Sequence, residues 1–215
     1  MEIELKYDLT EQPDASDKIF NDVMIHFLED GEIEKIPMSA VYYDTDTLDL
    51  AKEKIAFRIR NEGGKYVGTL KWNNETAEEL SMREEMNIHL PKEAAEGEPD
   101  IGIFRESGIS DDLIRICGKK KLVPIVTMRF TRSQVRVDTG TSISELSIDF
   151  GEIHANGKTA PIHEMELEYF SGDVEDMKKL GKRIAEKFHL RPEIRSKFGR
   201  GFALLEMDLE DESGK

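Results

Sequence analysis

The chain opens with Met1-Glu2-Ile3-Glu4-Leu5-Lys6, in which charged and apolar residues alternate. Successive side chains of a β-strand point to opposite faces, so this stretch predicts a strand with one charged and one apolar face. Two carboxylates and an ammonium in a row make a poor hydrophobic core. They suit a wet surface that holds a metal ion and an anion together. The first strand therefore predicts a functional face carrying Glu2, Glu4 and Lys6.

The same pattern returns near the other end of the chain as Glu164-Met165-Glu166-Leu167-Glu168. Between these two acidic strands, most of the chain alternates with the period of a strand. We expect further strands at residues 37–43, 54–62, 65–72, 81–90, 124–138 and 143–150, with the second acidic strand at 162–169.

Basic side chains follow the same alternation on other strands. Gly63-Gly64 predicts a hairpin that presents Arg58, Arg60 and Lys71 on one face. On strand 124–138, Arg129 and Arg132 have opposite parity. Both can face one cavity only if a β-bulge lies between them.

Helical periodicity appears in three segments, at residues 17–30, 101–117 and 173–189. We find no linker, so residues 1–207 are expected to form a single domain. The remaining residues, 208–215, are expected to form an acidic, flexible tail.

The fold class that fits these patterns is α+β, with about eight strands in an antiparallel closed β-barrel. Its lumen would be charged, and helices would pack on its apolar outside. The alternative is a half-exposed sheet whose charged face is simply solvated. Acidic and basic residues occupy separate strands instead of mixing, and glutamate recurs at every second position twice, so we favour the barrel.

Composition narrows the class of protein. The chain has 215 residues, of which 38% are hydrophobic and 35% charged, and a formal net charge of −15. This charge argues against general nucleic-acid binding, which requires a basic face. Cys117 is the single cysteine, which fits a cytoplasmic protein without disulfides. No apolar run approaches the ~20 residues of a membrane span, so no membrane association is expected. An exposed sheet edge or helix face would allow a homodimer.

Charge of both signs in one lumen indicates the chemistry. Arginine forks match phosphate oxygens, so the basic lining suits a ligand with several negative charges. Carboxylates bind hard divalent cations, meaning Mg²⁺ or Mn²⁺. A metal, a basic lining and a polyphosphate together are what phosphoryl transfer or hydrolysis requires.

The chain resembles the CYTH domain superfamily, also called triphosphate tunnel metalloenzymes. The hallmark Glu-x-Glu-x-Lys of that family corresponds to Glu2, Glu4 and Lys6. Other matching segments occur in family order over nearly the whole chain: Tyr42-Tyr43-Asp44-Thr45, Arg58-Ile59-Arg60, Thr69-Leu70-Lys71, Arg83-Glu84-Glu85, residues 129–132, Asp149, residues 164–168 and Ser196-Lys197. Asn87 departs from the pattern, because many relatives carry a glutamate there. Segment 92–122 resembles a variable helical insert.

The resemblance implies a tunnel that binds a triphosphate and one or two divalent metals. The implied metal ligands are Glu2, Glu4, Glu164 and Glu166, supported by Glu168, Asp149 and Glu85. The implied phosphate-binding residues are Lys6, Arg58, Arg60, Lys71, Arg129, Arg132 and Lys197. The expected catalytic set is Lys6, Glu4 and Glu166, with Lys6 holding either the attacking water or a phosphate oxygen.

The predicted function is metal-dependent hydrolysis of inorganic triphosphate to pyrophosphate and phosphate. An adenylate cyclase of the same family, or a thiamine or nucleoside triphosphatase, would use the same tunnel, and the motifs do not separate them. A non-catalytic polyphosphate-binding module would need the basic lining but not two intact acidic rows. The acidic rows therefore favour an enzyme.

Overall fold

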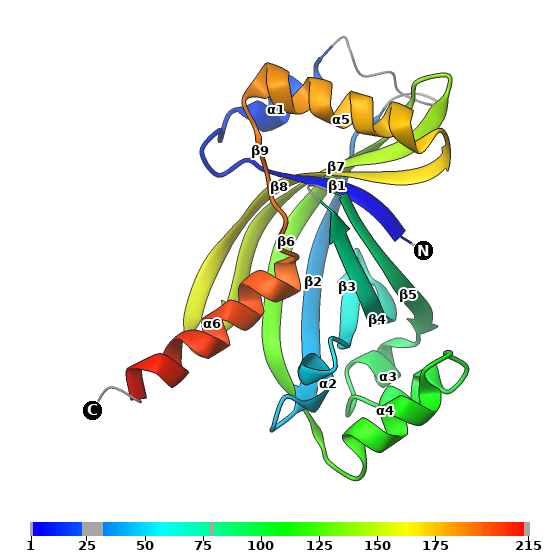
Figure 1. Ribbon diagram of the computed structural model, residues 1–215, viewed down its shortest axis with the longest axis vertical. Coiled ribbons are helices and arrows are strands. Elements are labelled where there is room, and N and C mark those ends of the chain that lie inside the picture. Colours follow the sequence, from blue (N-terminus) through cyan, green and yellow to red (C-terminus); the bar gives the residue numbers. More distant parts are fainter. Residues whose placement is uncertain (1, 23–31, 78–79, 213–215) are drawn as a thin grey trace.

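The protein is built on one strongly curved antiparallel sheet (Figure 1). The computed structural model describes residues 2–22, 32–77 and 80–212. The strands are β1 (Glu2–Asp8), β2 (Glu34–Thr45), β3 (Ala56–Glu62), β4 (Lys65–Ala77), β5 (Leu80–Leu90), β6 (Leu122–Asp138), β7 (Ser142–Ala155), β8 (Lys158–Gly172) and β9 (Arg191–Pro192). The helices are α1 (Ala15–Phe20), α2 (Asp49–Lys52), α3 (Lys92–Ala95), a 3-10 helix (Ile101–Phe104), α4 (Ser110–Cys117), α5 (Val174–Phe188) and α6 (Lys197–Glu212).

The prediction of an eight-stranded closed barrel is wrong. The strands form a nine-stranded sheet in the order β5-β4-β3-β2-β6-β7-β8-β1-β9. One edge of β1 pairs with β8, and its other edge is divided between β5, which pairs with Glu2–Leu5, and β9, which pairs with Tyr7 and Asp8. The two ends of the sheet therefore meet along only part of β1, and the sheet does not close over its full length. A two-residue strand that contains a proline has no alternation to detect, which is why β9 was missed.

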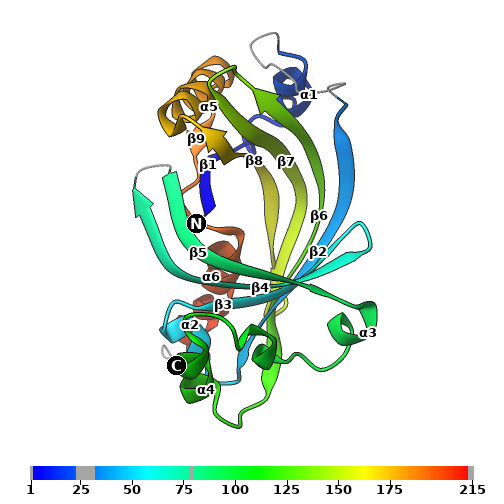
Figure 2. The ribbon, with the colours of Figure 1, turned by 90° about the vertical axis from the view of Figure 1, so that its right-hand side faces the viewer.

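Apolar residues pack with the helices in three clusters, two of which lie on the outer, convex face of the sheet. Helices α1 and α5 pack on β1, β6, β7 and β8 around buried residues such as Leu5, Leu146 and Leu180. Helices α2 and α4 pack with β3 and β4 around Phe57 and Leu113. Helix α6 packs instead on the concave face, against β6, β7 and β8 around Val126, Met128 and Ile153. The rest of the concave side, which the strands enclose in Figure 2, carries mostly charged side chains.

Most strands lie where alternation predicted them, and α5 confirms the helix expected at residues 173–189. The helix expected at residues 101–117 is divided into a 3-10 helix and α4. Of the helix expected at residues 17–30, α1 forms the first part, and residues 23–31 lie outside the described chain. Helix α6 was not predicted, and it continues past residue 207 to Glu212.

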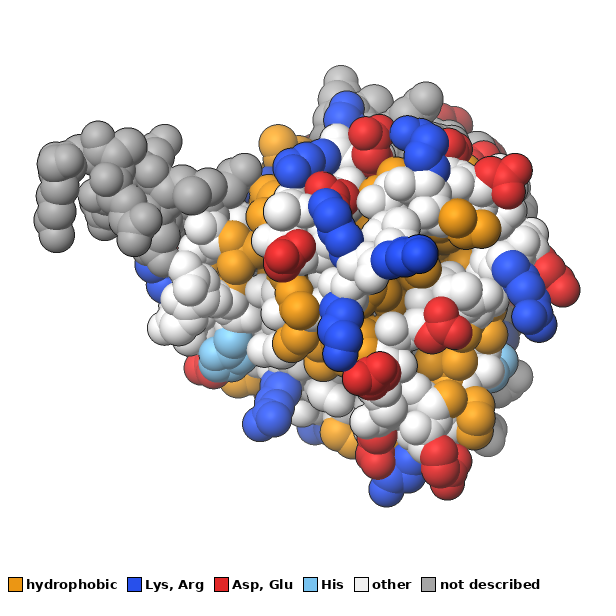
Figure 3. All heavy atoms as spheres, turned by 90° about the horizontal axis from the view of Figure 1, so that it is seen from below, with side chains coloured by type: hydrophobic (Ala, Val, Ile, Leu, Met, Phe, Trp, Pro, Cys, Tyr) orange, Lys and Arg blue, Asp and Glu red, His pale blue; other side chains and the backbone are white. Residues whose placement is uncertain are grey.

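The outer surface carries charge of both signs. On the face seen from below, basic and acidic side chains are interspersed with apolar ones (Figure 3). In the part of the chain that the structure describes, we find no helix with the length and apolar character that crossing a membrane requires.

Candidate active site

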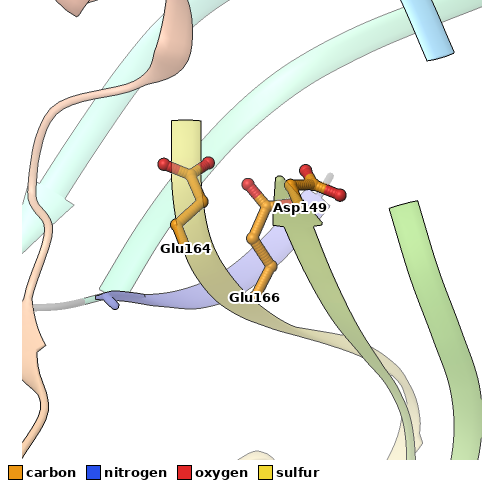
Figure 4. A group of neighbouring side chains, drawn as sticks. All are labelled: Asp149, Glu164 and Glu166. Atoms are coloured by element: carbon orange, nitrogen blue, oxygen red, sulfur yellow. The ribbon is translucent and has the colours of Figure 1, made fainter. Parts of the chain in front are cut away.

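Strand register brings acidic residues of three strands together on the concave face. Asp149 on β7 lies opposite Glu164 on β8. On the other side of β8, Glu166 lies opposite Lys6 on β1, and Glu168 lies opposite Glu4. Figure 4 shows the side chains of Asp149, Glu164 and Glu166 projecting to the same side of β7 and β8. One carboxylate oxygen from each lies within 4.8 Å of the others, and we call these three residues the acidic trio.

Three basic side chains contact the acidic trio. The Lys197 Nζ, at the start of α6, lies 2.7 Å from Asp149 Oδ2 and 2.8 Å from Glu166 Oε1, and it also pairs with Glu164. Arg132 on β6 donates two hydrogen bonds of 2.8 and 2.7 Å to Asp149 and one of 2.6 Å to Glu166. Arg200, one turn after Lys197, pairs with Glu164. Lys197 and Arg200 both reach the acidic trio because residues three apart in sequence share one face of a helix.

The surroundings of the acidic trio shift the pKa values of Glu164 and Glu166 in opposite directions. Burial raises the pKa of the Glu164 carboxyl above its ordinary value. Burial also acts on Glu166, but the attraction of Lys197 and Arg132 outweighs it and holds the pKa of that carboxyl well below its ordinary value. Burial alone would lower the pKa of Lys197, yet Asp149, Glu164 and Glu166 together raise it. Lys197 therefore stays charged.

Lys6 links the acidic trio to Glu4. Its ammonium lies 3.3 Å from Glu4 Oε1 and 4.0 Å from Glu166 Oε1, and both Glu4 and Lys6 are buried. The alternation of the first strand thus delivers what the sequence predicted, since Glu4 and Lys6 face the interior while Leu5 joins the outer core.

A basic wall formed by β3 and β4 also faces the interior. Arg58 donates to the Tyr42 hydroxyl at 3.5 Å and to Thr69 Oγ1 at 3.4 Å. Arg60 pairs with Glu62. Burial and the nearby charge of Arg58 lower the pKa of Arg60 to about 10. Arg60 lines the cavity, so its partly desolvated guanidinium is placed to bind an anion there.

The acidic and basic walls line one cavity of about 290 Å³. Glu4, Lys6, Glu166, Glu168, Glu85, Arg58, Arg60, Lys71, Arg132 and Lys197 all contribute to its lining. Asp149 and Glu164 have no exposed surface and lie behind Lys197, which contacts both. The cavity therefore brings together most of the residues that the sequence singled out.

Three predicted residues have other placements. Arg129 is exposed on the outer face, because the pairing of β2 with β6 runs in unbroken register from Arg129 to Arg132 and leaves no bulge there. Glu85 pairs with Lys71 on the basic wall, away from the acidic trio. The side chain of Glu2 lies outside the part that the structure describes.

Two residues of the site, Arg200 and Tyr42, are not among the predicted site residues. Arg200 was missed because α6 was not predicted, although its spacing of three from Lys197 is a helical signal. Tyr42 belongs to an expected strand and to a segment that matches the family, but no role in the site was predicted for it. It lines the cavity, accepts a hydrogen bond from Arg58 and stacks on Phe198 with ring centroids 4.7 Å apart. Tyr42 thereby connects the basic wall to the first turn of α6.

The donors of the acidic trio fit a hard divalent cation such as Mg²⁺ or Mn²⁺. Carboxylate oxygens are the ligands that these ions prefer, and three of them converge here around a position that already holds a positive charge, the Lys197 ammonium. Glu4 can add a fourth carboxylate from the side of Lys6.

The chain thus combines a curved antiparallel sheet with acidic and basic residues that face one interior. The sequence model of the CYTH domain matches residues 1–201, and the chain belongs to that family.

Relatives of this chain agree with that assignment. An inorganic triphosphatase of Haemophilus influenzae is 28% identical over 174 residues, which are 80% of this chain and 47% of the relative. The chain thus spans about half the length of the curated relative it matches. Among solved structures, a Hippeastrum protein described as a putative adenylyl cyclase with a dominant triphosphatase activity aligns with a TM-score of 0.69 at 23% identity, covering 94% of this chain and 96% of that one. A putative adenylate cyclase of Bacillus halodurans aligns with a TM-score of 0.55 at 20% identity, covering 91% and 94%.

Proposed function

We propose that this chain hydrolyses inorganic triphosphate to pyrophosphate and phosphate with Mg²⁺ or Mn²⁺. The observation that carries the proposal is the single cavity lined by both the acidic residues and the basic wall. The similarity to an inorganic triphosphatase supports the choice of substrate. A bound divalent cation would be held by the acidic trio with Glu4, and it would neutralise phosphate charge and activate water.

The residues of the chain itself have distinct roles in this proposal. Arg58, Arg60 and Lys71 bind the oxygens of the triphosphate and fix its path through the cavity. Lys6 and Arg132 hold the carboxylates in position and place positive charge near the terminal phosphate. Attack of water on the terminal phosphorus breaks its bond to the bridging oxygen, and pyrophosphate leaves. In this proposal the enzyme acts in the cytoplasm, as its single cysteine led us to expect.

The decisive experiment compares substrates. Purified protein with Mg²⁺ or Mn²⁺ should release phosphate faster from tripolyphosphate than from ATP or thiamine triphosphate. Cyclic AMP as the main product from ATP would instead identify an adenylate cyclase. Tight binding of tripolyphosphate without any phosphate release would identify a binding module.

A second experiment tests the acidic side of the cavity. Glu4→Gln should abolish phosphate release while the circular dichroism spectrum stays unchanged, because the substitution removes a carboxylate but keeps its shape. Glu152→Gln is the matched control, since Glu152 is exposed on the outer face of β7. If Glu4→Gln retained near wild-type activity, the assignment of Glu4 to the metal would be wrong.

A further inference from the structure

The acidic trio is already neutralised in the folded chain. Its three carboxylates face three cations, which are Lys197, Arg132 and Arg200. Lys6 brings an additional charge toward Glu166, but Glu4 balances it. A divalent cation that entered this cluster without displacing anything would leave two surplus positive charges in a buried place. Such a surplus is unfavourable, because buried charge is tolerated only when it is paired.

The three cations are not equally replaceable. Arg132 is fixed by a planar fork on Asp149 and a further bond to Glu166. Arg200 pairs with one member of the trio, Glu164, and also donates to the Pro161 carbonyl at 3.2 Å. Lys197 is a point charge on a flexible side chain, and it contacts all three carboxylates at once. Its ammonium thus occupies the position that a shared cation would take.

The position of Lys197 relative to the cavity is the second observation. Lys197 lines the cavity, whereas Asp149 and Glu164 are fully buried behind it. A cation arriving through the cavity can therefore reach these two carboxylates only if the ammonium moves. The same side chain lies over the ring of Phe130, another cavity-lining residue, with Nζ 5.4 Å from the ring centroid.

We propose that Lys197 is a place-holding counter-ion, which a divalent cation displaces from the acidic trio and which then pairs with the triphosphate. This inference rests on the proposed function, because it assigns the displaced ammonium to the substrate. It makes Lys197 a positioning residue with two successive partners: carboxylates before the cation binds and phosphate oxygens afterwards. Exchange of one positive charge for two leaves the cluster with a single surplus charge, which the anionic substrate neutralises.

The test measures Mn²⁺ binding in the absence of any triphosphate, by calorimetry on the full chain. Lys197→Met removes the competing ammonium, so the Kd for Mn²⁺ should fall by about tenfold, a typical coupling between two binding events. Mn²⁺ should also raise the melting temperature of Lys197→Met more than that of the wild type. The Kd for imidotriphosphate, a non-hydrolysable analogue, should rise in the same variant.

Arg200→Met is the matched control, since it removes one positive charge from the same helix but leaves the ammonium in place. Its Kd for Mn²⁺ should change clearly less than that of Lys197→Met. Equal tightening in both variants would mean a general charge effect and would overturn the proposal, as would weaker Mn²⁺ binding by Lys197→Met. Because no triphosphate is present, these results are independent of whether the wild type hydrolyses tripolyphosphate.

Wild-type crystals soaked in MnCl₂ provide a second measurement if Lys197→Met does not fold. The proposal expects anomalous density among Asp149, Glu164 and Glu166, with the Lys197 ammonium withdrawn from them. Mn²⁺ at the trio with all three Lys197 contacts intact, or Mn²⁺ bound elsewhere, would refute it.

Discussion

At the scale of single residues, Arg132 determines how two buried carboxylates are held. Its guanidinium makes three hydrogen bonds to Asp149 and Glu166, and its side chain is 15% exposed. Arg132→Met leaves both carboxylates without these bonds. We expect the free energy of unfolding to fall by about 3–5 kcal/mol, as measured for broken buried ion pairs. Urea denaturation followed by circular dichroism measures this loss.

Arg129→Met is the control on the same strand. Arg129 is exposed on the outer face, so its substitution should change the free energy of unfolding by less than about 0.5 kcal/mol. Similar losses in both variants would contradict the placement of Arg132. The sequence shows that these two arginines have opposite parity, but it does not show which of them faces the cavity. The answer depends on an unbroken register between β2 and β6, which is a tertiary property.

At the scale of elements, Asp49, the first residue of α2, links this helix to the segment that follows α4. Its carboxylate accepts from Thr45 Oγ1 at 2.7 Å, from Thr47 Oγ1 at 2.8 Å and from Lys120 Nζ at 2.5 Å. The hydrogen bond from Lys120, followed by those from the two threonines, lowers the pKa of Asp49 below its ordinary value. A carboxyl with a lower pKa in the folded chain stabilises the fold above the unfolded pKa, near 3.9, and loses this contribution as the pH falls.

Asp49→Asn should therefore flatten the acid side of the stability profile. Between pH 6 and pH 3 the melting temperature of the variant should fall less than that of the wild type, because asparagine has no proton to gain. Scanning calorimetry at closely spaced pH values measures the difference. Parallel profiles for the two proteins would show that this attachment does not contribute to acid sensitivity.

Helix α6 approaches the sheet so closely that it tolerates no side chain at Gly201. A Cβ there would overlap Val126 Cγ1 and would lie 2.9 Å from Ile153 Cγ2. Gly201→Ala should lower the free energy of unfolding by about 1–3 kcal/mol through overpacking. Activity should fall as well, because the same helix carries Lys197. A Cβ at Gly199 meets only Ser196 Oγ, at 3.4 Å, so Gly199→Ala should gain up to about 1 kcal/mol from helix propensity. Equal effects of the two substitutions, measured by urea denaturation, would contradict this packing.

The elements differ in how well the sequence predicted them, and the reason is physical. A strand with one charged and one apolar face leaves a period of two in the sequence, so β1, β3 and β8 could be found. Helix α6 packs through glycine and aromatic residues and turns charged residues toward the cavity, which obscures its amphipathic pattern. The division of segment 101–117 follows from Gly108 and the turns around it, which interrupt the helix.

At the scale of the whole molecule, acidic and basic side chains form separate walls of the concave face. Alternation predicted an acidic wall and a basic wall, and the cavity contains both. The sequence could not predict that α6 inserts Lys197 and Arg200 into the acidic side, because residues 197 and 164 are distant in sequence and no pattern relates them. Nor could alternation decide how far the sheet closes, since both edges of a strand have the same side-chain pattern.

Segregated charge predicts that the folded chain binds a polyanion even without metal. Burial, followed by the charge of Arg58, lowers the pKa of Arg60, and among the described residues the Nε of Arg60 has no hydrogen-bond partner. An anion at the basic wall would favour the charged form of Arg60 and would accept a hydrogen bond from its Nε. Tripolyphosphate at 100 times its Kd, in EDTA, should stabilise the protein by about 2.7 kcal/mol and raise its melting temperature accordingly. Sodium chloride of equal ionic strength should not reproduce this increase.

Arg60→Met should lose most of the stabilisation by tripolyphosphate. Lys121→Met, which removes an exposed positive charge near α4, should keep it. This comparison separates a site from a general charge effect, because the net charge of −15 opposes binding of any polyanion by an amount that both variants change equally. If tripolyphosphate stabilised Arg60→Met as much as the wild type, the anion would bind outside the basic wall. The cavity would then not be the place where the two charged walls act together.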